Sequence, residues 1–391
     1  MADKKTNNVS LVTEGTSQIV DSKFKGRKDL KIVTIPEGVT EIGAGAFWGC
    51  SHLTSVNLPN SVTSIGDSAF EGCKRLKSIS LPNGVTRIGV SAFRGCESLS
   101  FIKIPGTIAH INRNTFRECS SLNSIEIPKS ITSIGVSAFE KCTSLTSVVL
   151  PESVIFVRAN AFRNCKSLSS AILSKNIVHI DRNIFYGCSN LTSVVFPAEA
   201  TSIANGAFLG CTNLRSIELP AGITIIGNGA FSACTKLTSV SLPQKIVHIG
   251  NSVFRGCTKL GSIEIPDGVT SIGNNAFRDC SQLPSITLPS GVSRIGKNAF
   301  KNCVCLSSIE LPNAVTCIDN GAFQGCSRLA GIKIPEEVTF IGSDAFRDCS
   351  ALSSIDLPKG ISSIRDGTLQ GCTMLCRVVI PEGITHIGSY A

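Results

Sequence analysis

The sequence predicts an α/β repeat solenoid, in which every coil contributes parallel strands and one short helical turn. The first observation is a cysteine that recurs every 23 residues from Cys50 to Cys372, without insertion or deletion. The second is an apolar pattern that returns with the same period, and residues 53–75 show it in full. Such self-similarity is typical of stacked repeat architectures, so the 391 residues are expected to form one solenoid rather than several globular domains.

Two extended segments open each coil. In residues 53–75, Val56 and Leu58 alternate with polar residues, which indicates a short strand with one buried face. Pro59 ends that strand, because proline lacks the N–H group that a strand ladder needs. Val62 and Ile65 form an apolar pair in a second extended segment. Stacking is expected to bring equivalent residues of neighbouring coils together in a parallel sheet.

The end of each coil is predicted to be a helical turn. Gly66 turns the chain, because glycine tolerates positive φ. Asp67 and Ser68 are favourable N-cap residues directly before Ala69 and Phe70, which predicts one turn of helix there. The glycine and cysteine that follow close the coil and lead into the next strand.

The chain has 18 cysteines, a number that would fit a disulfide scaffold in a small secreted protein. Fifteen of them stand in one stacked column with parallel Cβ vectors, whereas a disulfide needs vectors that converge. We therefore predict that these thiols are buried and free. Cys305, Cys317 and Cys376 lie outside the column, and Cys305 and Cys376 are expected to be exposed and reactive.

The repeat also carries a family resemblance. It reads L-x-S-I-x-L-P-x-x-V-T-x-I-G-x-x-A-F-x-G-C and covers about residues 24–391. This pattern resembles the BspA-like, or Treponema-type, class of leucine-rich repeats. The resemblance implies a leucine-rich-repeat superhelix with a parallel sheet on its concave face and short helical turns on its convex face. It also implies a role at the cell surface, since known members are often implicated in adhesion to host proteins or other cells.

The chain is expected to have three segments. Residues 1–8 form a polar leader, residues 9–31 a degenerate N-terminal capping repeat, and residues 32–391 the solenoid. In the capping repeat, Val12, Ile19, Phe24 and Leu30 still fall on the apolar columns. The pattern stops at Ala391, one residue short of the next expected phenylalanine, which predicts a solenoid truncated within a repeat.

The location of the protein is left open by these patterns. The first residues contain lysines but no apolar segment that would form a secretion signal. No apolar run approaches the 18 residues that a transmembrane helix needs. The sequence by itself therefore indicates the cytoplasm, whereas the family resemblance indicates the cell surface.

One column of the first strand is predicted to carry a partner site. It holds the outward residue between the last two apolar positions, and Val149, Ile172 and Val195 make it apolar in three successive repeats. Exposed apolar patches with polar rims are typical of partner sites, but β-branched residues also favour strands, and the residues leave both interpretations open. Acidic residues bracket and extend this strip at Glu126, Glu218, Glu264, Glu310 and Asp356.

A second column, directly after the repeated phenylalanine, is rich in basic residues. The formal net charge of the chain is +9, and such a ribbon could bind a polyanion, either an acidic glycan or a nucleic acid. Solvated surface arginine is the commoner explanation, and no interleaved aromatic residues support base stacking. The basic members of this column are Arg94, Arg117, Arg163, Arg255, Arg278, Lys301 and Arg347.

No constellation of residues predicts catalysis, a metal site, a cofactor or a small-molecule substrate. His110, His179, His248 and His386 share one column, but neighbours are at least three coils apart, roughly 14 Å, which is too far for a shared metal. The sequence therefore predicts a non-enzymatic scaffold that recognises a protein, possibly of a host or cell surface, through its concave face. The alternative is a polyanion binder that uses the convex basic ribbon.

Overall fold

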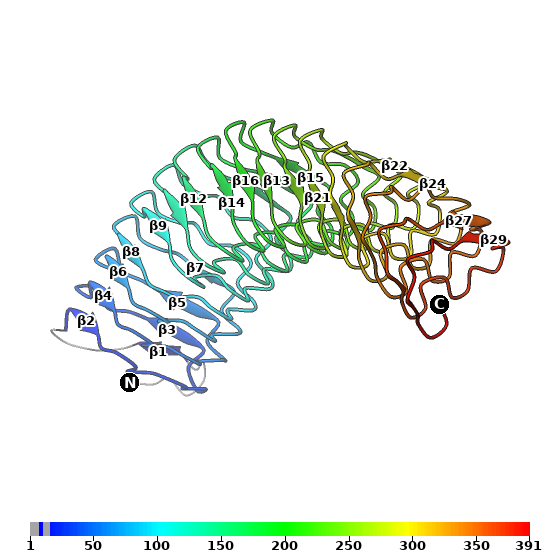
Figure 1. The fold of residues 1–391 in the computed structure, drawn as a ribbon. Coiled ribbons are helices and arrows are strands. Elements are labelled where there is room, and N and C mark those ends of the chain that lie inside the picture. The colour runs from blue at the N-terminus through cyan, green and yellow to red at the C-terminus, as the bar shows by residue number, and fades with distance from the viewer. Residues whose placement is uncertain (1–7, 11–15) are drawn as a thin grey trace. The chain divides into compact units, whose positions relative to one another are not determined.

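The computed structural model describes residues 8–10 and 16–391, which form two compact units (Figure 1). The N-terminal unit spans Met1–Pro197 and the C-terminal unit spans Ala198–Ala391. Each unit is a stack of coils, here called rungs, and each rung contains a first strand, a second strand and a turn. Equivalent residues of successive rungs are 23 positions apart, as the pairing of Val149 with Ile172 shows. The predicted parallel solenoid is therefore confirmed within each unit.

The first strands are two or three residues long and pair in parallel with their neighbours. In most of the three-residue strands from Ile32 onward, the central residue is buried and the flanking residues lie nearer the surface, because side chains alternate along a strand. In the N-terminal unit these strands are β1 (Asn8–Ser10), β3 (Ile32–Thr34), β5 (Ser55–Asn57), β7 (Ser78–Ile79), β11 (Ser147–Val149), β13 (Ser170–Ile172) and β15 (Ser193–Val195). In the C-terminal unit they are β18 (Ser239–Ser241), β20 (Ser262–Glu264), β22 (Ser285–Thr287), β24 (Ser308–Glu310), β27 (Ser354–Asp356) and β29 (Arg377–Val379).

The second strands are two residues long and also run parallel. In the N-terminal unit they are β2 (Gln18–Ile19), β4 (Glu41–Ile42), β6 (Ser64–Ile65), β8 (Arg87–Ile88), β9 (His110–Ile111), β10 (Ser133–Ile134), β12 (Phe156–Val157) and β14 (His179–Ile180). In the C-terminal unit they are β16 (Ser202–Ile203), β17 (Ile225–Ile226), β19 (His248–Ile249), β21 (Ser271–Ile272), β23 (Arg294–Ile295), β25 (Cys317–Ile318), β26 (Phe340–Ile341), β28 (Ser363–Ile364) and β30 (His386–Ile387).

The row of first strands is interrupted in the N-terminal unit. The sheet of β1, β3, β5 and β7 continues only as an isolated bridge between Ser78 and Phe101. Residues 124–126 form no strand, and regular pairing resumes at β11. The break lies next to Glu126 and Val149, two of the outward residues that the sequence singles out.

The predicted helical turn is wrong, since no helix occurs in residues 8–10 and 16–391. Ser68 and Gly72 have φ values of 54° and 73°, and left-handed residues at this spacing prevent a helix from propagating. The backbone N–H groups of residues 69–73 therefore point alternately into their own rung and toward the next rung. Those of Ala69, Glu71 and Cys73 close turns on the carbonyl three residues earlier, at 3.1–3.3 Å. The N–H groups between them donate to the next rung instead, at 2.7–2.8 Å.

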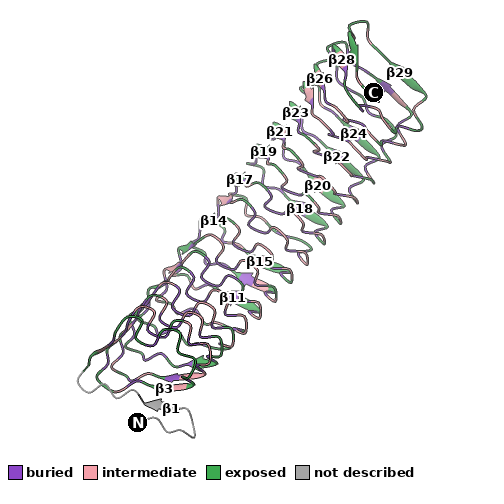
Figure 2. Ribbon diagram, turned by 90° about the horizontal axis from the view of Figure 1, so that it is seen from below, coloured by how far each residue is buried: buried purple, intermediate pink, exposed green. Residues whose placement is uncertain are grey.

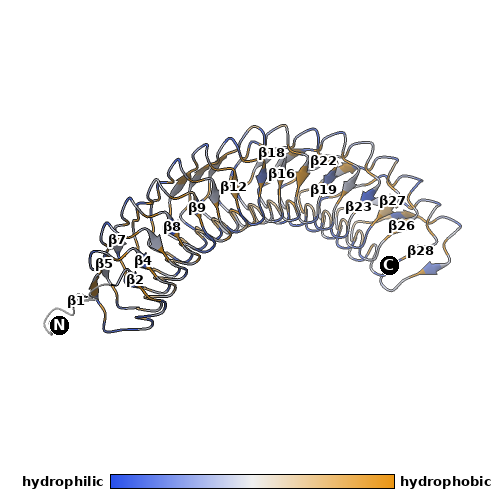
Figure 3. Cartoon of the chain, turned by 90° about the vertical axis from the view of Figure 1, so that its left-hand side faces the viewer, coloured by the Kyte–Doolittle hydropathy of each residue, from blue (hydrophilic) through white to orange (hydrophobic). Residues whose placement is uncertain are grey.

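The core lies inside the coils of each unit. Figure 2 shows that buried residues recur in every coil, and Figure 3 shows that hydrophobic residues recur in the same way. The repeated phenylalanines stack in register, with ring centroids 5.2–5.8 Å apart. Each rung adds one more apolar layer, so stability depends on contact with the rungs above and below.

The column cysteines are buried, and all 18 cysteines are free thiols. Most column thiols donate to the carbonyl of the phenylalanine one rung earlier, as Cys73 Sγ does to Phe47 O at 3.2 Å. Burial raises the pKa of these thiols, to about 12 for Cys188 and Cys257. A small side chain that satisfies its own polar group explains why cysteine suits this column.

The expected capping repeat is only partly described. The leader up to residue 7 and Val12 lie outside the described residues. Ile19, Phe24 and Leu30 are buried, and β2 pairs with β4. A capping role for residues 9–31 stays a prediction.

A ladder of four asparagines connects five rungs of the C-terminal unit. The Oδ1 atom of each asparagine accepts the backbone N–H of the equivalent residue one rung later, at 2.7–2.9 Å. Asp67 makes the same contact to Val90 N in the N-terminal unit, at 3.0 Å. The ladder comprises Asn205, Asn228, Asn251 and Asn274.

Replacement of Asn251 by alanine is expected to lower the free energy of unfolding by about 1 kcal/mol, because the Asn274 N–H loses its acceptor. Asn251→Asp keeps an acceptor at the same place and should stay within about 0.5 kcal/mol of the parent protein. Urea unfolding followed by circular dichroism measures both values. Equal stability of the alanine and aspartate variants would contradict a structural role for the ladder.

Candidate protein-binding face

The candidate site lies on the first-strand face of the N-terminal unit. Val148 is buried, so the next residue along β11, Val149, points outward. The same alternation exposes Ile172 in β13 and Val195 in β15. Val149, Ile172 and Val195 are 58%, 44% and 54% exposed and are paired in register across the three strands. These three residues are called the apolar strip.

A groove of about 490 Å³ lies at one end of the apolar strip, where the first strand is interrupted. Its floor is formed by the unpaired segment around Ile125 and Ile127. Phe101 and Val149 line it from the rungs before and after, and Glu126 and Lys129 supply its charges. The groove therefore combines apolar walls with a carboxylate and an ammonium group.

Phe101 lines this groove and is not among the site residues that the sequence predicts. It is 53% exposed and occupies a column that holds serine in most other rungs. A large exposed aromatic side chain is an unusual exception in such a column, so the signal was present. The predicted outward column lies two residues further along the strand and therefore does not include Phe101.

The remaining acidic residues of the predicted site belong to the C-terminal unit. Glu218, Glu264, Glu310 and Asp356 are exposed and occupy the outward column in every second rung. Asp356 is 3.6 Å from the Arg377 guanidinium. Within that unit they form a spaced row of carboxylates, whereas Glu126 and the apolar strip belong to the N-terminal unit.

The turn face of the N-terminal unit does not present a simple row of positive charge. Arg94 lies 3.4 Å from Glu71, Arg117 lies 3.6 Å from Glu140, and Arg163 lies 4.0 Å from the same buried carboxylate. These glutamates stand in or beside the arginine column. The three arginines that were predicted to form a ribbon are therefore paired with acidic groups.

The turn face of the C-terminal unit is mixed. Arg278 lies 3.4 Å from Asp279, and Arg347 lies 3.4 Å from Asp344. Arg255 and Lys301 make no ion pair within the described part of the chain, and Arg255 is exposed. Five of the seven predicted ribbon residues thus have acidic partners. Within the ribbon, only two positive charges are left unpaired for a polyanion.

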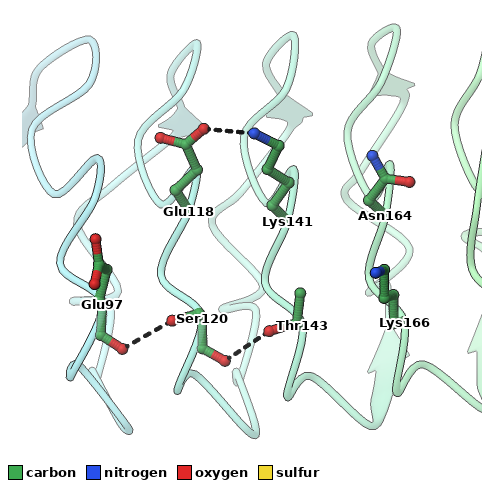
Figure 4. A pocket seen from close by; sticks show the side chains of 7 residues that line it. All are labelled: Glu97, Glu118, Ser120, Lys141, Thr143, Asn164 and Lys166. Carbon is green, nitrogen blue, oxygen red and sulfur yellow. Dashed lines mark hydrogen bonds and ion pairs between the residues drawn. The ribbon is translucent and has the colours of Figure 1, made fainter.

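A hollow of about 440 Å³ on the turn face of the N-terminal unit is lined by charges of both signs (Figure 4). Glu118 and Lys141 form an ion pair at 2.9 Å, and this contact lowers the pKa of the Glu118 carboxyl. Both residues are left-handed, at φ 64° and 62°, in a column where preceding rungs have glycine. The charges compensate one another, so the hollow shows no preference for one class of ligand. Its lining residues are Glu97, Glu118, Ser120, Lys141, Thr143, Asn164 and Lys166.

The second-strand face of the N-terminal unit also has exposed apolar residues. Ile155 and Phe156 are exposed beside a hollow of about 380 Å³, and the Arg158 guanidinium lies over the Phe156 ring at 4.5 Å. The Arg158 side chain therefore covers one face of the Phe156 ring. Ile155 gives a matched control for Ile172, since the two side chains are 43% and 44% exposed.

Other classes of site find little support in the described residues. No group of three His, Cys, Asp or Glu side chains there is arranged to hold a metal ion. His110 lies 2.9 Å from Ser133 Oγ through Nδ1, which accounts for one ring nitrogen. Within residues 8–10 and 16–391 there is also no helix of the length and hydrophobicity that a membrane span requires.

Comparison with known proteins identifies the relatives of this chain. A family model described as "BspA type Leucine rich repeat region (6 copies)" matches residues 2–123, 109–214, 178–306 and 293–391. A leucine-rich repeat protein from Bacteroides ovatus is 31% identical, with a TM-score of 0.66 over 85% of this chain and 82% of that protein. A leucine rich cell surface protein from Faecalibacterium prausnitzii is 27% identical, with a TM-score of 0.53 over 83% of this chain and 87% of that one. The search of curated proteins gives no match.

Proposed function

This chain belongs to the BspA-type leucine-rich repeat family, and from that premise we propose that it is a recognition scaffold that binds a protein partner through its first-strand face. The apolar strip is the observation that carries the proposal. Three aliphatic side chains face outward in successive rungs, where the repeat pattern requires no apolar residue. Contiguous exposed apolar surface with a polar rim marks sites of protein association.

The surroundings of the apolar strip also suit a protein partner. The groove beside it offers a concave apolar anchor point, and Glu126 adds a charge that can select among partners. The first-strand face is the one that the family resemblance places on the concave side. The spaced carboxylates of the C-terminal unit offer a second region for contact with a basic partner.

We further propose that recognition takes place at a cell surface, with adhesion to a host or neighbouring cell as its purpose. One relative, from Faecalibacterium prausnitzii, is described as a cell surface protein. A rigid stack of rungs suits that role, because it presents its outward residues at fixed spacing. The function proposed here needs no catalytic residue or cofactor.

Substitution Ile172→Glu is expected to reduce capture of the partner by about tenfold or more, because it places a charge in the middle of the apolar strip. The intact chain serves as bait for proteins from its native surroundings, with cross-link mapping of what it retains. Ile155→Glu is the matched control, with the same chemistry and exposure on the second-strand face. Equal loss in both variants, or in neither, would contradict the proposed site.

A polyanion binder remains the second candidate, and Arg255 and Lys301 are its main support because they lack ion pairs in the described part of the C-terminal unit. Polyanion binding should weaken steeply with salt through counterion release, and it should survive Ile172→Glu. Binding to the apolar strip should show the opposite behaviour. Titration of the captured partner with salt therefore separates the two candidates.

A further inference from the structure

We infer that the partner presents an amphipathic α-helix, which lies along the stacking direction of the rungs with an arginine in the groove and aliphatic residues on the apolar strip. The inference rests on the function proposed above and specifies the partner of that same site. Three features carry it: the spacing of the apolar strip, the shape of the groove and the charge at its end.

The spacing of the apolar strip matches a helix better than a strand. Neighbouring rungs of a parallel sheet are about 4.8 Å apart, so Val149 and Val195 are separated by about 9.6 Å along the stack. Helix positions i and i+7 are about 10.5 Å apart on one face, with i+3 or i+4 between them. Same-face residues of an extended peptide recur at about 6.7 Å and 13 Å, which matches neither one nor two rungs.

The neighbouring column leaves room for a helix to approach. Ser147, Ser170 and Ser193 lie two residues before the three members of the apolar strip and point to the same face. Serine side chains are short, so a helix can pack against the aliphatic side chains without steric obstruction on that side. The other flank carries Glu152 and Lys175, which pair with each other at 2.7 Å.

The groove extends the same line by one rung and favours an arginine. A helix residue one turn before the first aliphatic anchor would lie over the floor near Ile125, between Phe101 and Val149. Arginine has an apolar stem that can pack in such a groove while its guanidinium stays at the rim. There it would meet the exposed Phe101 ring and the Glu126 carboxylate, which are favourable partners for a planar cation.

The charge pattern supports this orientation. Glu126 is exposed, lies in the same column as the apolar strip and has no ion pair in the described part of the chain. Lys129 lines the groove on the side nearer the second strand. A matching helix therefore carries its arginine in line with the aliphatic anchors and an acidic residue on one flank.

The test uses three synthetic probes and the full chain. The helical probe is a stapled peptide with arginine at position i and leucine at i+4, i+7 and i+11. The extended probe has the same number of arginine and leucine residues, with leucine at alternate positions, and it also contains a proline that prevents helix formation. The third probe is the helical peptide with glutamate in place of arginine. Fluorescence anisotropy measures the affinity of each.

We expect the helical probe to bind, with about tenfold weaker affinity for Ile172→Glu and unchanged affinity for Ile155→Glu. Glu126→Arg should weaken the arginine probe and strengthen the glutamate probe, each by about fivefold to tenfold. This exchange of preference requires a direct contact, which a merely structural role of Glu126 would not produce.

The outcomes separate this inference from the proposed function. Equal or tighter binding of the extended probe, with sensitivity to Ile172→Glu, would overturn the helix and leave the protein-binding face intact. If neither probe binds but capture of a native partner depends on Ile172, the helix inference also fails and the protein-binding face stands. If neither probe binds and no capture depends on Ile172, both proposals fail.

Discussion

Raising the pH from 8 to 10 is expected to unfold both units of the protein, because the buried cysteine column resists ionisation only while the rungs are folded. Burial raises the pKa of twelve column thiols well above the ordinary value, six in each unit, and to about 12 for Cys188 and Cys257. In the unfolded chain the same thiols ionise near pH 8.5.

The sign of the effect follows from proton linkage. A pKa that is higher in the folded state gives stability that is complete below the unfolded pKa and is lost as the pH rises toward the folded pKa. Each such thiol removes about 1.4 kcal/mol per pH unit above pH 8.5, or about 2 kcal/mol at pH 10. Six thiols then remove on the order of 12 kcal/mol from each unit, which is comparable to the whole stability of a typical domain.

Circular dichroism between pH 7 and pH 11 measures the transition, with thiolate absorbance near 240 nm recorded in parallel under reducing conditions. Loss of structure and appearance of thiolate should coincide between about pH 9 and pH 10.5 and should reverse on return to pH 7. A gradual rise of thiolate near pH 9 with the fold intact would contradict the prediction. At pH 8, the exposed Cys376 and the half-buried Cys305, which lie outside the column, should react with a thiol reagent before the column does.

The rung register could be predicted from the sequence because the cysteine period fixes which residues become neighbours. Val149 pairs with Ile172 because both follow the same buried column by one residue. The alternation that points these side chains outward is a local property of a strand and needs no tertiary information. For the same reasons the apolar strip could be located before its geometry was known.

The turn could not be predicted by local rules. Asp67 and Ser68 have the composition of a helix N-cap, yet the Asp67 carboxylate accepts the N–H of Val90 in the next rung. Ser68 takes a left-handed φ of 54°, which directs its own N–H to the Val90 carbonyl. Capping preferences derive from isolated helices, whereas here the neighbouring rung supplies better hydrogen-bond partners than a helix would.

The ion pairs of the turn face follow from the order of charges in the sequence. Glu71 and Glu140 belong to the same column as Arg94 and Arg117, so the opposing charges were visible in the sequence. Residues of one column are stacked about 5 Å apart, close enough to form ion pairs. Each charged residue must therefore be compared with its neighbours in the same column, because opposite charges one rung apart can form an ion pair. Arg117 and Glu140, which lie 3.6 Å apart, are an example.

The phenylalanine column offers the second large effect, and Phe300→Ala is expected to lower the free energy of unfolding of the C-terminal unit by about 3–5 kcal/mol. The ring is fully buried and stacks on Phe277 and Phe323, with centroids 5.4 Å and 5.5 Å away. Its removal leaves a cavity between two rungs and two ring faces without a partner. In a solenoid such a loss also weakens the coupling of the rungs on either side.

Phe300→Leu is the matched control, since it keeps most of the apolar volume and should cost less than about 1.5 kcal/mol. The chain itself has leucine in this column at Leu369, so the residue type is compatible with the rung. Urea unfolding followed by circular dichroism compares the two variants, and hydrogen exchange of residues 277–323 locates the effect. If alanine and leucine destabilised the protein equally, the loss would come from the missing aromatic stacking and not from the cavity. If alanine cost less than about 1 kcal/mol, the phenylalanine column would not be the main source of cohesion between rungs.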